Sequence, residues 1–202
     1  MEPFVTLRAV AVPVDIANCD TDQIIPARFL RRLPSDGGYD RFLFHDLRFD
    51  ADGAVRPDFV LNRPEFRGGR IIVADVNWGC GSSRENAVYA LLANGIRCVV
   101  APSFGDIHYN NCIRHGVLPV RLPRATCDAM RAALHAAPGG EVTVDLPAQQ
   151  VVAPDGATHR FEIDAFDKKR LLEGLDDVGL TLGHEAAILA FEARQAREHD
   201  WI

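Results

Sequence analysis

The amino-acid sequence predicts an α/β fold with a mostly parallel central sheet and an added β-hairpin layer. The main observation is a strand–turn–helix pattern that occurs twice in succession, over residues 71–94 and 98–115, before an apolar run at 117–122. Strand–helix–strand connections of this length join parallel neighbours through a right-handed crossover. The second observation is a pair of alternating segments, 142–146 and 161–163, which predicts the β-hairpin.

The elements that flank this centre follow in chain order. Residues 4–14 are apolar and rich in β-branched side chains, so they predict one or two short strands. The helices of the two central units should end at Gly95 and Gly116, because glycine favours the left-handed conformation that closes a helix. A third helix is expected after Pro123, with Cys127 on its apolar stripe.

The last third of the chain predicts a turn and then a helical tail. Pro154-Asp155-Gly156 is a turn signal between the two alternating segments. Residues 164–202 predict a helical C-terminal segment that breaks near Gly179 and ends in an amphipathic helix around Ile188 and Phe191.

The length of the chain suits one hydrophobic core. With 202 residues, we expect a single domain over residues 1–202. Residues 18–69 interrupt the regular pattern, because they are rich in Arg, Asp, Gly and Pro and show no clear period. Such length without periodicity is typical of a functional or a flexible loop, and we expect mobility within residues 30–69.

The charge and hydropathy of the chain exclude several classes of partner. A net charge of −6 gives no general attraction to nucleic acid or to an anionic membrane surface. No run approaches the roughly 18 apolar residues of a membrane span, and the N-terminus lacks the pattern of a signal peptide. We therefore expect a cytoplasmic protein that holds any anionic ligand with local cations.

The cysteine pattern indicates that this chain binds no metal cluster by itself. The five cysteines contain no C-x-x-C pair, whereas zinc and iron–sulfur ligands usually come in such close pairs. Reduced cysteines pack like small apolar side chains in a cytosolic protein, and we expect most of these thiols to be buried.

The most informative motif is Gly79-Cys80-Gly81-Ser82-Ser83-Arg84-Glu85. Two glycines between a strand and a helix allow a tight turn, and the helix N-terminus that follows favours an anion. Ser82 and Glu85 also have the S-x-x-E spacing of a capping box, which would make the serine purely structural. That alternative leaves Arg84 unexplained, since a cation opposes the partial positive charge of a helix start. Arg84 therefore indicates an anionic ligand.

Other common motifs fail on spacing. A dinucleotide-binding loop needs G-x-G-x-x-G, and Arg84 occupies its last position. No P-loop lysine follows the glycines, and no G-x-S-x-G elbow occurs.

This motif resembles the G-x-G-S-S-R-E signature of the swivelling domain of the aconitase superfamily. Four further stretches, in the same order, resemble bacterial isopropylmalate isomerase small subunits. They are Asn18-Cys19-Asp20-Thr21-Asp22-Gln23-Ile24-Ile25-Pro26-Ala27 with Phe29-Leu30, Ser103-Phe104-Gly105-Asp106-Ile107 with Asn110-Asn111-Cys112, Gly116-Val117-Leu118-Pro119, and Leu171-Leu172-Glu173-Gly174-Leu175-Asp176-Asp177. The resemblance covers residues 5 to 195.

The resemblance implies a three-layer β/β/α swivelling domain and a site shared between two polypeptides. It implies a large-subunit partner, in a heterodimer or heterotetramer, whose [4Fe–4S] cluster binds the hydroxyl and a carboxylate of a small dicarboxylate substrate. No cofactor is expected on this chain. By the same resemblance Ser82 is the base that removes a carbon-bound proton, while Arg84 and Ser83 hold a substrate carboxylate.

The resemblance also assigns roles to three more residues. Asp22 matches an active-site aspartate of the superfamily, and its alternative role is that of a turn or cap residue. Arg31 and Arg32 stand where the family places its substrate-recognition loop, or they form a solvated charge pair. His108 and His115 are interpreted as surface histidines of a helix.

The function implied is that of a hydro-lyase that interconverts 2- and 3-isopropylmalate by dehydration and rehydration. Two departures from the family pattern leave the substrate open: Asn86 stands where relatives commonly have histidine, and His108 where they often have an aromatic residue. The alternatives are a small subunit of a paralogous hydro-lyase for citraconate, dimethylmaleate or homoaconitate-type substrates, and a swivel domain that binds a ligand without catalysis.

Overall fold

A computed structural model describes residues 1–198 of the chain. Within this range the strands are β1 (Thr6–Val14), β2 (Ile71–Ala74), β3 (Cys98–Ala101), β4 (Leu118–Arg121), β5 (Glu141–Asp145), β6 (Gln150–Val152) and β7 (Thr158–Arg160). The α-helices are α1 (Thr21–Ile24), α2 (His45–Arg48), α3 (Glu85–Ala93), α4 (Asp106–His115), α5 (Arg124–Ala136), α6 (Ala165–Glu173), α7 (Asp177–Leu182) and α8 (Glu185–Glu198). Short 3-10 turns η1 (Ala27–Phe29), η2 (Pro34–Asp36), η3 (Tyr39–Phe42), η4 (Val60–Asn62) and η5 (Pro64–Phe66) lie between α1 and β2.

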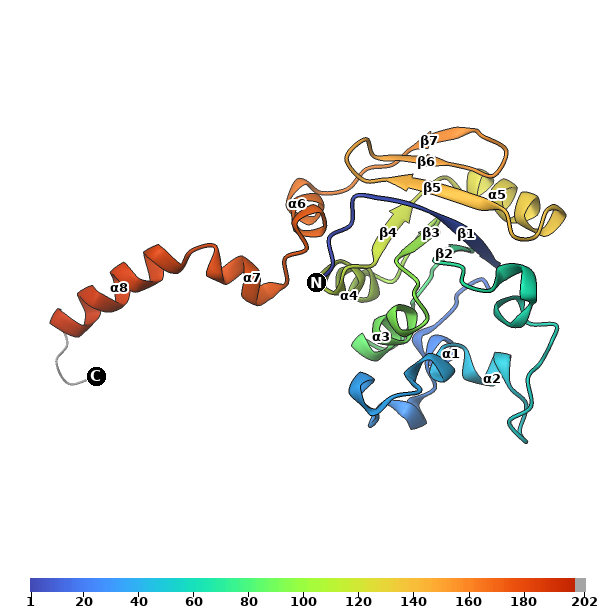
Figure 1. Ribbon diagram of the computed structural model, residues 1–202, viewed down its shortest axis with the longest axis horizontal. Coiled ribbons are helices and arrows are strands. Elements are labelled where there is room, and N and C mark those ends of the chain that lie inside the picture. The colour runs from blue at the N-terminus through green and yellow to red at the C-terminus, as the bar shows by residue number, and fades with distance from the viewer. Residues whose placement is uncertain (199–202) are drawn as a thin grey trace.

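The strands form one curled sheet in the order β4-β3-β2-β1-β5-β6-β7. Strands β1 to β4 are parallel, and β5 to β7 are added antiparallel beyond β1. The long strand β1 belongs to both halves, because its residues 6–10 pair with β5 and its residues 11–14 pair with β2. Figure 1 shows the two halves as an upper and a middle layer, with α1, α3 and α4 below them. The predicted α/β fold with β/β/α layers is confirmed.

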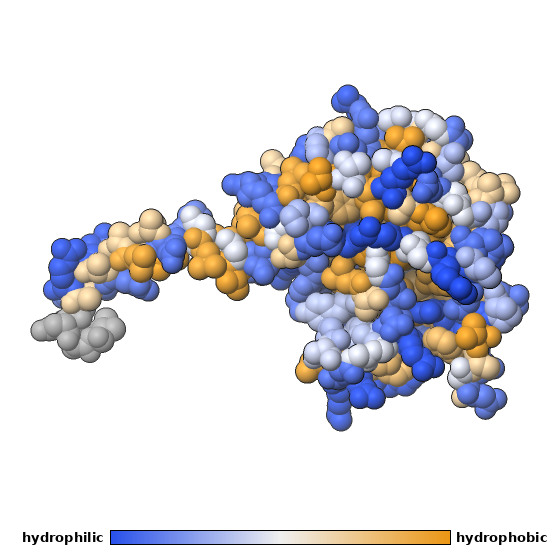
Figure 2. All heavy atoms as spheres, viewed as in Figure 1, coloured by the Kyte–Doolittle hydropathy of each residue, from blue (hydrophilic) through white to orange (hydrophobic). Residues whose placement is uncertain are grey.

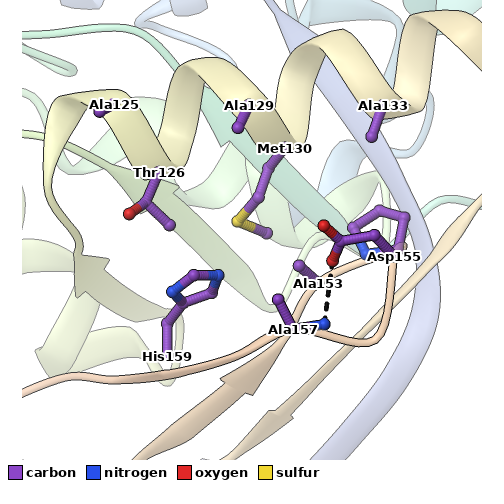
Figure 3. A pocket seen from close by; sticks show the side chains of 10 residues that line it. Ala125, Thr126, Ala129, Met130, Ala133, Ala153, Asp155, Ala157 and His159 are labelled. Carbon is purple, nitrogen blue, oxygen red and sulfur yellow. Dashed lines mark hydrogen bonds between the residues drawn. The ribbon is translucent and has the colours of Figure 1, made fainter.

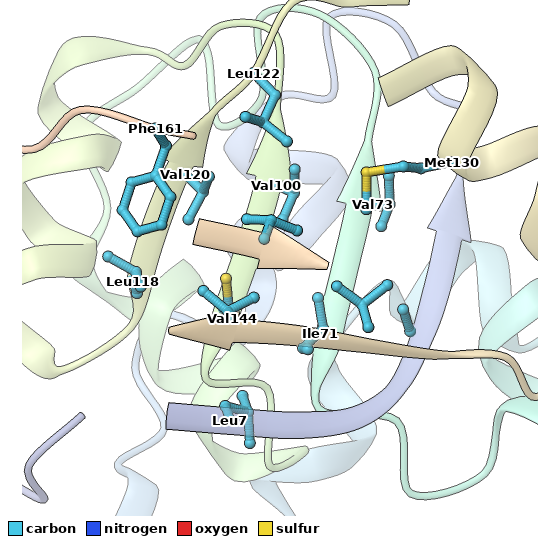
Figure 4. Close-up of a cluster of buried hydrophobic side chains, with 14 of the residues drawn as sticks. Leu7, Ile71, Val73, Val100, Leu118, Val120, Leu122, Met130, Val144 and Phe161 are labelled. Atoms are coloured by element: carbon cyan, nitrogen blue, oxygen red, sulfur yellow. The ribbon is translucent and has the colours of Figure 1, made fainter. Parts of the chain in front are cut away.

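Two apolar cores lie on the two faces of the parallel strands. In β2, Ile71 and Val73 face a core shared with β5 and α5, whereas Ile72 and Ala74 face a core shared with α3. Figure 4 shows the first core, with Met130 of α5 beside Val73. Because both faces are covered, these strands are continuously apolar rather than alternating, as is typical of parallel sheets.

The irregular region between α1 and β2 is built on the helical layer. Tyr39, Leu43, Phe44 and Phe66 are buried there and belong to the same core as α3. Asn86 of α3 donates a hydrogen bond from Nδ2 to the Tyr39 hydroxyl at 3.0 Å. These contacts place the region over the helices rather than over the antiparallel half of the sheet.

Two details of the predicted fold are wrong. The strand β5 pairs with β6 rather than with residues 161–163, so the added layer is a three-stranded meander. Pro154-Asp155-Gly156 does form a turn, but between β6 and β7. The tail also does not break at Gly179, which lies inside α7; its breaks lie at residues 174–176 and 183–184.

The helices α7 and α8 project from the body as an arm. This arm, Asp177–Glu198, extends away from the sheet beyond α6 in Figure 1. Five of its large apolar side chains are exposed: Val178, Leu182, Ile188, Leu189 and Phe191. Figure 2 shows apolar patches along the arm. Residues 164–202, the segment expected to be helical, contain α6, α7 and α8, and residues 199–202 lie outside the described range.

Candidate active site

Two loops that leave the carboxyl ends of β1 and β2 run side by side. The Asn18 amide donates to the Val76 carbonyl at 2.9 Å, and the Gly79 amide donates to the Cys19 carbonyl at 2.7 Å. A parallel bridge between Asp20 and Cys80 continues this pairing. The register of two adjacent parallel strands thereby brings the segment after residue 20 against the glycine motif.

The glycines of the motif turn the second loop sharply. Gly79 has φ of 69° and Gly81 has φ of 85°, a region in which other residues are strained. Gly79 also has no room for a side chain, since a Cβ there would lie 2.2 Å from Cδ2 of His108. The predicted tight turn is confirmed, and it delivers Ser82 to the surface.

Ser82 lies before the helix and is exposed. The helix α3 begins at Glu85 with Arg84 as its N-cap residue, and Arg84 makes no side-chain capping hydrogen bond. The capping-box alternative for Ser82 and Glu85 is therefore wrong. The Ser82 carbonyl accepts a hydrogen bond from the Thr21 hydroxyl at 2.8 Å, whereas its own hydroxyl has no partner among the described residues. This hydroxyl is open to a ligand.

Arg84 and Asp22 form a bidentate ion pair. Nη2 of Arg84 donates to Oδ2 of Asp22 at 2.8 Å, and Nη1 donates to Oδ1. The hydrogen bond from Arg84 lowers the pKa of the Asp22 carboxyl below its ordinary value. The Arg84 side chain is 14% exposed and that of Asp22 is 53% exposed, so the carboxylate is the outer and more accessible partner.

The anion predicted for Arg84 is thus supplied, in the free chain, by Asp22. The N-cap of α1 is Asp20, which forms a capping box with Gln23, so Asp22 is not the cap of its own turn. The structure brings together Ser82, Arg84 and Asp22, and the exposed Ser83 lies between the first two in sequence.

Arg31 and Arg32 are not brought to this pair. Both are exposed and follow η1, and in the described part of the chain no hydrogen bond or ion pair of their side chains occurs. Their roles stay predictions.

Four residues next to the site, Asp20, Thr21, Gln23 and His108, were not predicted to contribute to it. Thr21 is buried and holds the Ser82 backbone, and Asp20 with Gln23 has a D-x-x-Q spacing that signals the cap of α1. His108 was expected on the surface and is instead 3% exposed, in the first turn of α4. His115 does lie at the end of α4, partly exposed.

A separate hollow of about 260 Å³ lies between α5 and the turn that joins β6 to β7. Figure 3 shows its lining, in which several alanines lie beside Thr126, Met130 and His159, and in which Asp155 accepts a hydrogen bond from the Ala157 amide at 2.9 Å. It shares no residue with the loops above and presents no arginine or lysine. It is therefore a poor site for an anion.

Three further findings concern the thiols, groups of metal ligands and apolar helices. Cys19, Cys98, Cys112 and Cys127 are buried and free, as predicted, and Cys80 is partly exposed. Within residues 1–198 no three His, Cys, Asp or Glu side chains gather as ligands for a metal ion. No helix of this range has the length and the apolar character needed to cross a membrane.

Family models match most of the chain. The aconitase C-terminal domain matches residues 1–125, and the model described as LeuD_N matches residues 128–165. The C-terminal domain of the 3-isopropylmalate dehydratase small subunit matches residues 177–202.

Relatives of known name match over the full length. The 3-isopropylmalate dehydratase small subunit of Gluconacetobacter diazotrophicus is 51% identical over 201 residues, which cover 100% of this chain and 97% of the relative. That of Rhodospirillum centenum is 49% identical and covers 100% of this chain and 98% of the relative. The crystal structure of a 3-isopropylmalate dehydratase from Methanocaldococcus jannaschii superposes with a TM-score of 0.64 at 27% identity, covering 93% of this chain and 99% of that chain. The chain therefore belongs to the family of 3-isopropylmalate dehydratase small subunits.

Proposed function

We propose that the chain is the small subunit of a 3-isopropylmalate dehydratase, which interconverts 2- and 3-isopropylmalate by dehydration and rehydration in leucine biosynthesis. The rest of the site, with a [4Fe–4S] cluster, is supplied by a large partner polypeptide. The observation that carries the proposal is the exposed Ser82 hydroxyl on the same loop as Arg84, whose guanidinium already binds a carboxylate.

The Arg84–Asp22 pair supports binding of a dicarboxylate. A substrate carboxylate has the same two acceptor oxygens as the Asp22 side chain, and a guanidinium holds either in the same bidentate way. Exchange of one carboxylate for the other keeps Arg84 neutralised throughout. The chain as a whole carries a net charge of −6, so this local cation, with Arg31 or Arg32 for the second carboxylate, has to supply the attraction.

Ser82 is proposed as the base of the reaction. Its Oγ, as the alkoxide, takes the carbon-bound proton of the substrate and becomes a neutral hydroxyl. The electron pair of that C–H bond forms the alkene as the neighbouring C–O bond breaks and hydroxide leaves with the electrons of that bond. The Lewis acidity that assists the departing hydroxide is the part supplied by the partner's cluster. The Thr21 hydroxyl fixes the Ser82 backbone while the reaction proceeds, and positioning of this kind lowers the barrier by fixing the reacting geometry.

Reconstitution with a candidate large subunit under anaerobic conditions tests the proposal. The complex should form alkene from 3-isopropylmalate, and a panel with citraconate, dimethylmaleate and homoaconitate-type substrates should show lower kcat/KM. A complex that prefers one of these, or a chain that binds no large subunit, would contradict it.

The variant Ser82→Ala separates catalysis from folding. It should lower kcat by about a thousandfold or more, because the base is lost. Its thermal midpoint and its co-purification with the large subunit should match the wild type, since the hydroxyl makes no hydrogen bond in the described part of the chain. A variant that keeps its turnover would refute the role of Ser82.

A further inference from the structure

His108 is an unpaired polar side chain in the interior of the protein. It is 3% exposed, and neither of its ring nitrogens has a hydrogen-bond partner among the described residues. Buried polar groups are nearly always paired, because an unpaired one forfeits its bonds to water. Because its ring nitrogens make no hydrogen bond among the described residues, the ring acts on its neighbours through its shape alone.

The ring of His108 lies directly against the turn of the glycine motif. A Cβ on Gly79 would meet Cδ2 of His108 at 2.2 Å and Cγ at 2.3 Å. The start of α4 is equally close, since a Cβ on Gly105 would lie 2.6 Å from the Gly79 carbonyl oxygen. The Gly105 amide donates to the Trp78 carbonyl at 2.8 Å. The glycine-motif loop therefore packs directly against the first turn of α4.

The opposite side of the same turn is also fixed. The Gly79 amide donates to the Cys19 carbonyl at 2.7 Å, so the backbone is held between the first loop and the imidazole. Gly79 and Gly81 both have positive φ, and only Cys80 and Gly81 separate Gly79 from Ser82. A shift of the turn at Gly79 would be passed on to Ser82 over three residues.

We infer that His108 is a positioning residue for Ser82, and that its neutral ring holds the turn at Gly79 by shape. The inference rests on the function proposed above for Ser82. Burial lowers the pKa of His108 to about 4, so the ring carries no charge near neutral pH. An aromatic ring of similar size can therefore replace it, whereas a small side chain cannot.

Two substitutions at position 108 test this in the reconstituted complex. His108→Ala should lower kcat by about tenfold to a hundredfold with little change in KM, because a displacement on the order of 1 Å at a reacting group has such an effect. His108→Phe should stay within about threefold of the wild type. The control is Ile113→Ala, on the same helix but in the core of the opposite sheet face, which should lose stability and keep its kcat.

A substitution on the other side of the contact supplies a reciprocal test. Gly79→Ala should nearly abolish activity, since its Cβ would overlap the ring. In the double variant Gly79→Ala with His108→Ala the overlap is removed, and kcat should recover by at least about tenfold over Gly79→Ala alone. Strain from the positive φ of Gly79 should keep the recovery incomplete.

Hydrogen exchange gives a readout that does not depend on activity. Amides of residues 79–84 should exchange faster in His108→Ala than in the wild type, and at wild-type rates in His108→Phe and Ile113→Ala. A wild-type kcat in His108→Ala, or an equal fall of kcat in His108→Phe or Ile113→Ala, would overturn the inference. If Ser82→Ala keeps its turnover, the proposed function of Ser82 fails instead, and the exchange rates still decide whether His108 holds the turn.

Discussion

At the scale of single residues, Arg84 and Asp22 show how the fold makes a site from distant positions. They are 62 positions apart in the sequence, and the parallel register of β1 and β2 places them in one ion pair. The sequence predicts that each is functional, but neither local spacing nor composition predicts that they meet. In the free chain Asp22 occupies the place in which a substrate carboxylate is proposed to bind.

The variant Arg84→Lys tests this exchange. A lysine cannot form the two parallel hydrogen bonds of a guanidinium, and loss of one charge-assisted bond of roughly 1.5 kcal/mol corresponds to about a tenfold rise in KM. Steady-state kinetics of the reconstituted complex give the value. Arg8→Lys is the control, because Arg8 forms an exposed pair with Glu141 between β1 and β5 and should leave KM unchanged. An unaltered KM in Arg84→Lys would contradict the binding role.

The buried His108 should make the stability of the free chain depend on acidity. Its pKa in the folded chain is about 4, below the ordinary value of 6.5, because burial disfavours the charged ring. The unfolded chain therefore binds the proton first as pH falls, so this contribution is complete above about pH 6.5 and is lost between about 6.5 and 4. The wild type should lose about 2 kcal/mol of unfolding free energy between pH 7 and pH 5 through this group alone.

Urea unfolding at the two pH values measures this loss. His108→Phe removes the titrating group and keeps the ring, so its loss over the same interval should be smaller by about that amount. Equal losses in the two proteins would show that the pKa of His108 is not lowered in the folded chain.

At the scale of the elements, one arginine of α5 binds the first residue of each of the two site loops. Arg131, whose side chain is 9% exposed, contacts Asp15 after β1 at 2.8 Å and Asp75 after β2 at 3.3 Å. It also donates to the Ala74 carbonyl at 2.7 Å and to Asp128 of its own helix at 2.7 Å. A planar group with several donors meets this set of acceptors in a way that lysine could not.

Removal of this guanidinium should weaken the fold. Arg131→Ala leaves the largely buried Asp75 and the Ala74 carbonyl without the guanidinium, and breaking such a pair typically lowers the free energy of unfolding by about 3 to 5 kcal/mol. Arg124→Ala on the same helix breaks only an exposed pair with Asp128 and should lose less than about 1 kcal/mol. Urea unfolding of both variants checks the difference, and equal losses would count against it.

The same scale shows which elements a sequence can predict. The parallel units were predicted to within a few residues, because both faces of β2 and β3 are apolar and glycines end α3 and α4. The meander was missed because β6 and β7 are three residues long, and β7 is the polar segment Thr158–Arg160. The short turns between α1 and β2 form because Tyr39, Leu43 and Phe44 are buried against residues distant in the sequence. No hydrophobic periodicity within this segment predicts such burial.

The site was predicted in part for a related reason. Ser82 and Arg84 lie in a contiguous motif, so their types and order were readable from the sequence. The roles of Thr21 and His108 depend on contacts across the fold, with the Ser82 carbonyl and with Gly79. Such contacts exist only once the two loops and α4 are packed together.

At the scale of the whole molecule, the body and the arm have different sources of stability. The body contains the two cores on either side of the parallel strands. The arm, Asp177–Glu198, is joined to the body by an ion pair between Arg170 and Asp177. Among the described residues, every hydrogen bond made by residues 179–198 has its partner within the arm or in Asp176, the N-cap of α7.

Truncation after Asp177 should therefore leave the body intact. The thermal midpoint of the free chain should change by less than about 2 °C, because none of the side chains removed within the described range, residues 178–198, is buried. Truncation after Ile163 is the control: it also removes Leu171, which is fully buried and accepts a hydrogen bond from the Phe4 amide, and the midpoint should fall by several degrees. Calorimetry compares the two, and a comparable fall in both would show that the arm supports the body.

The exposed arm also determines how the free chain will behave in the presence of a protease. A helix of 14 residues without tertiary support is marginal in water, so α8 should open often enough for its backbone to be cut. The connection at Gly183–His184 offers a second point of attack between the two helices. Mild digestion should first release short C-terminal peptides and leave a resistant fragment of the body, whose mass would locate the end of the arm.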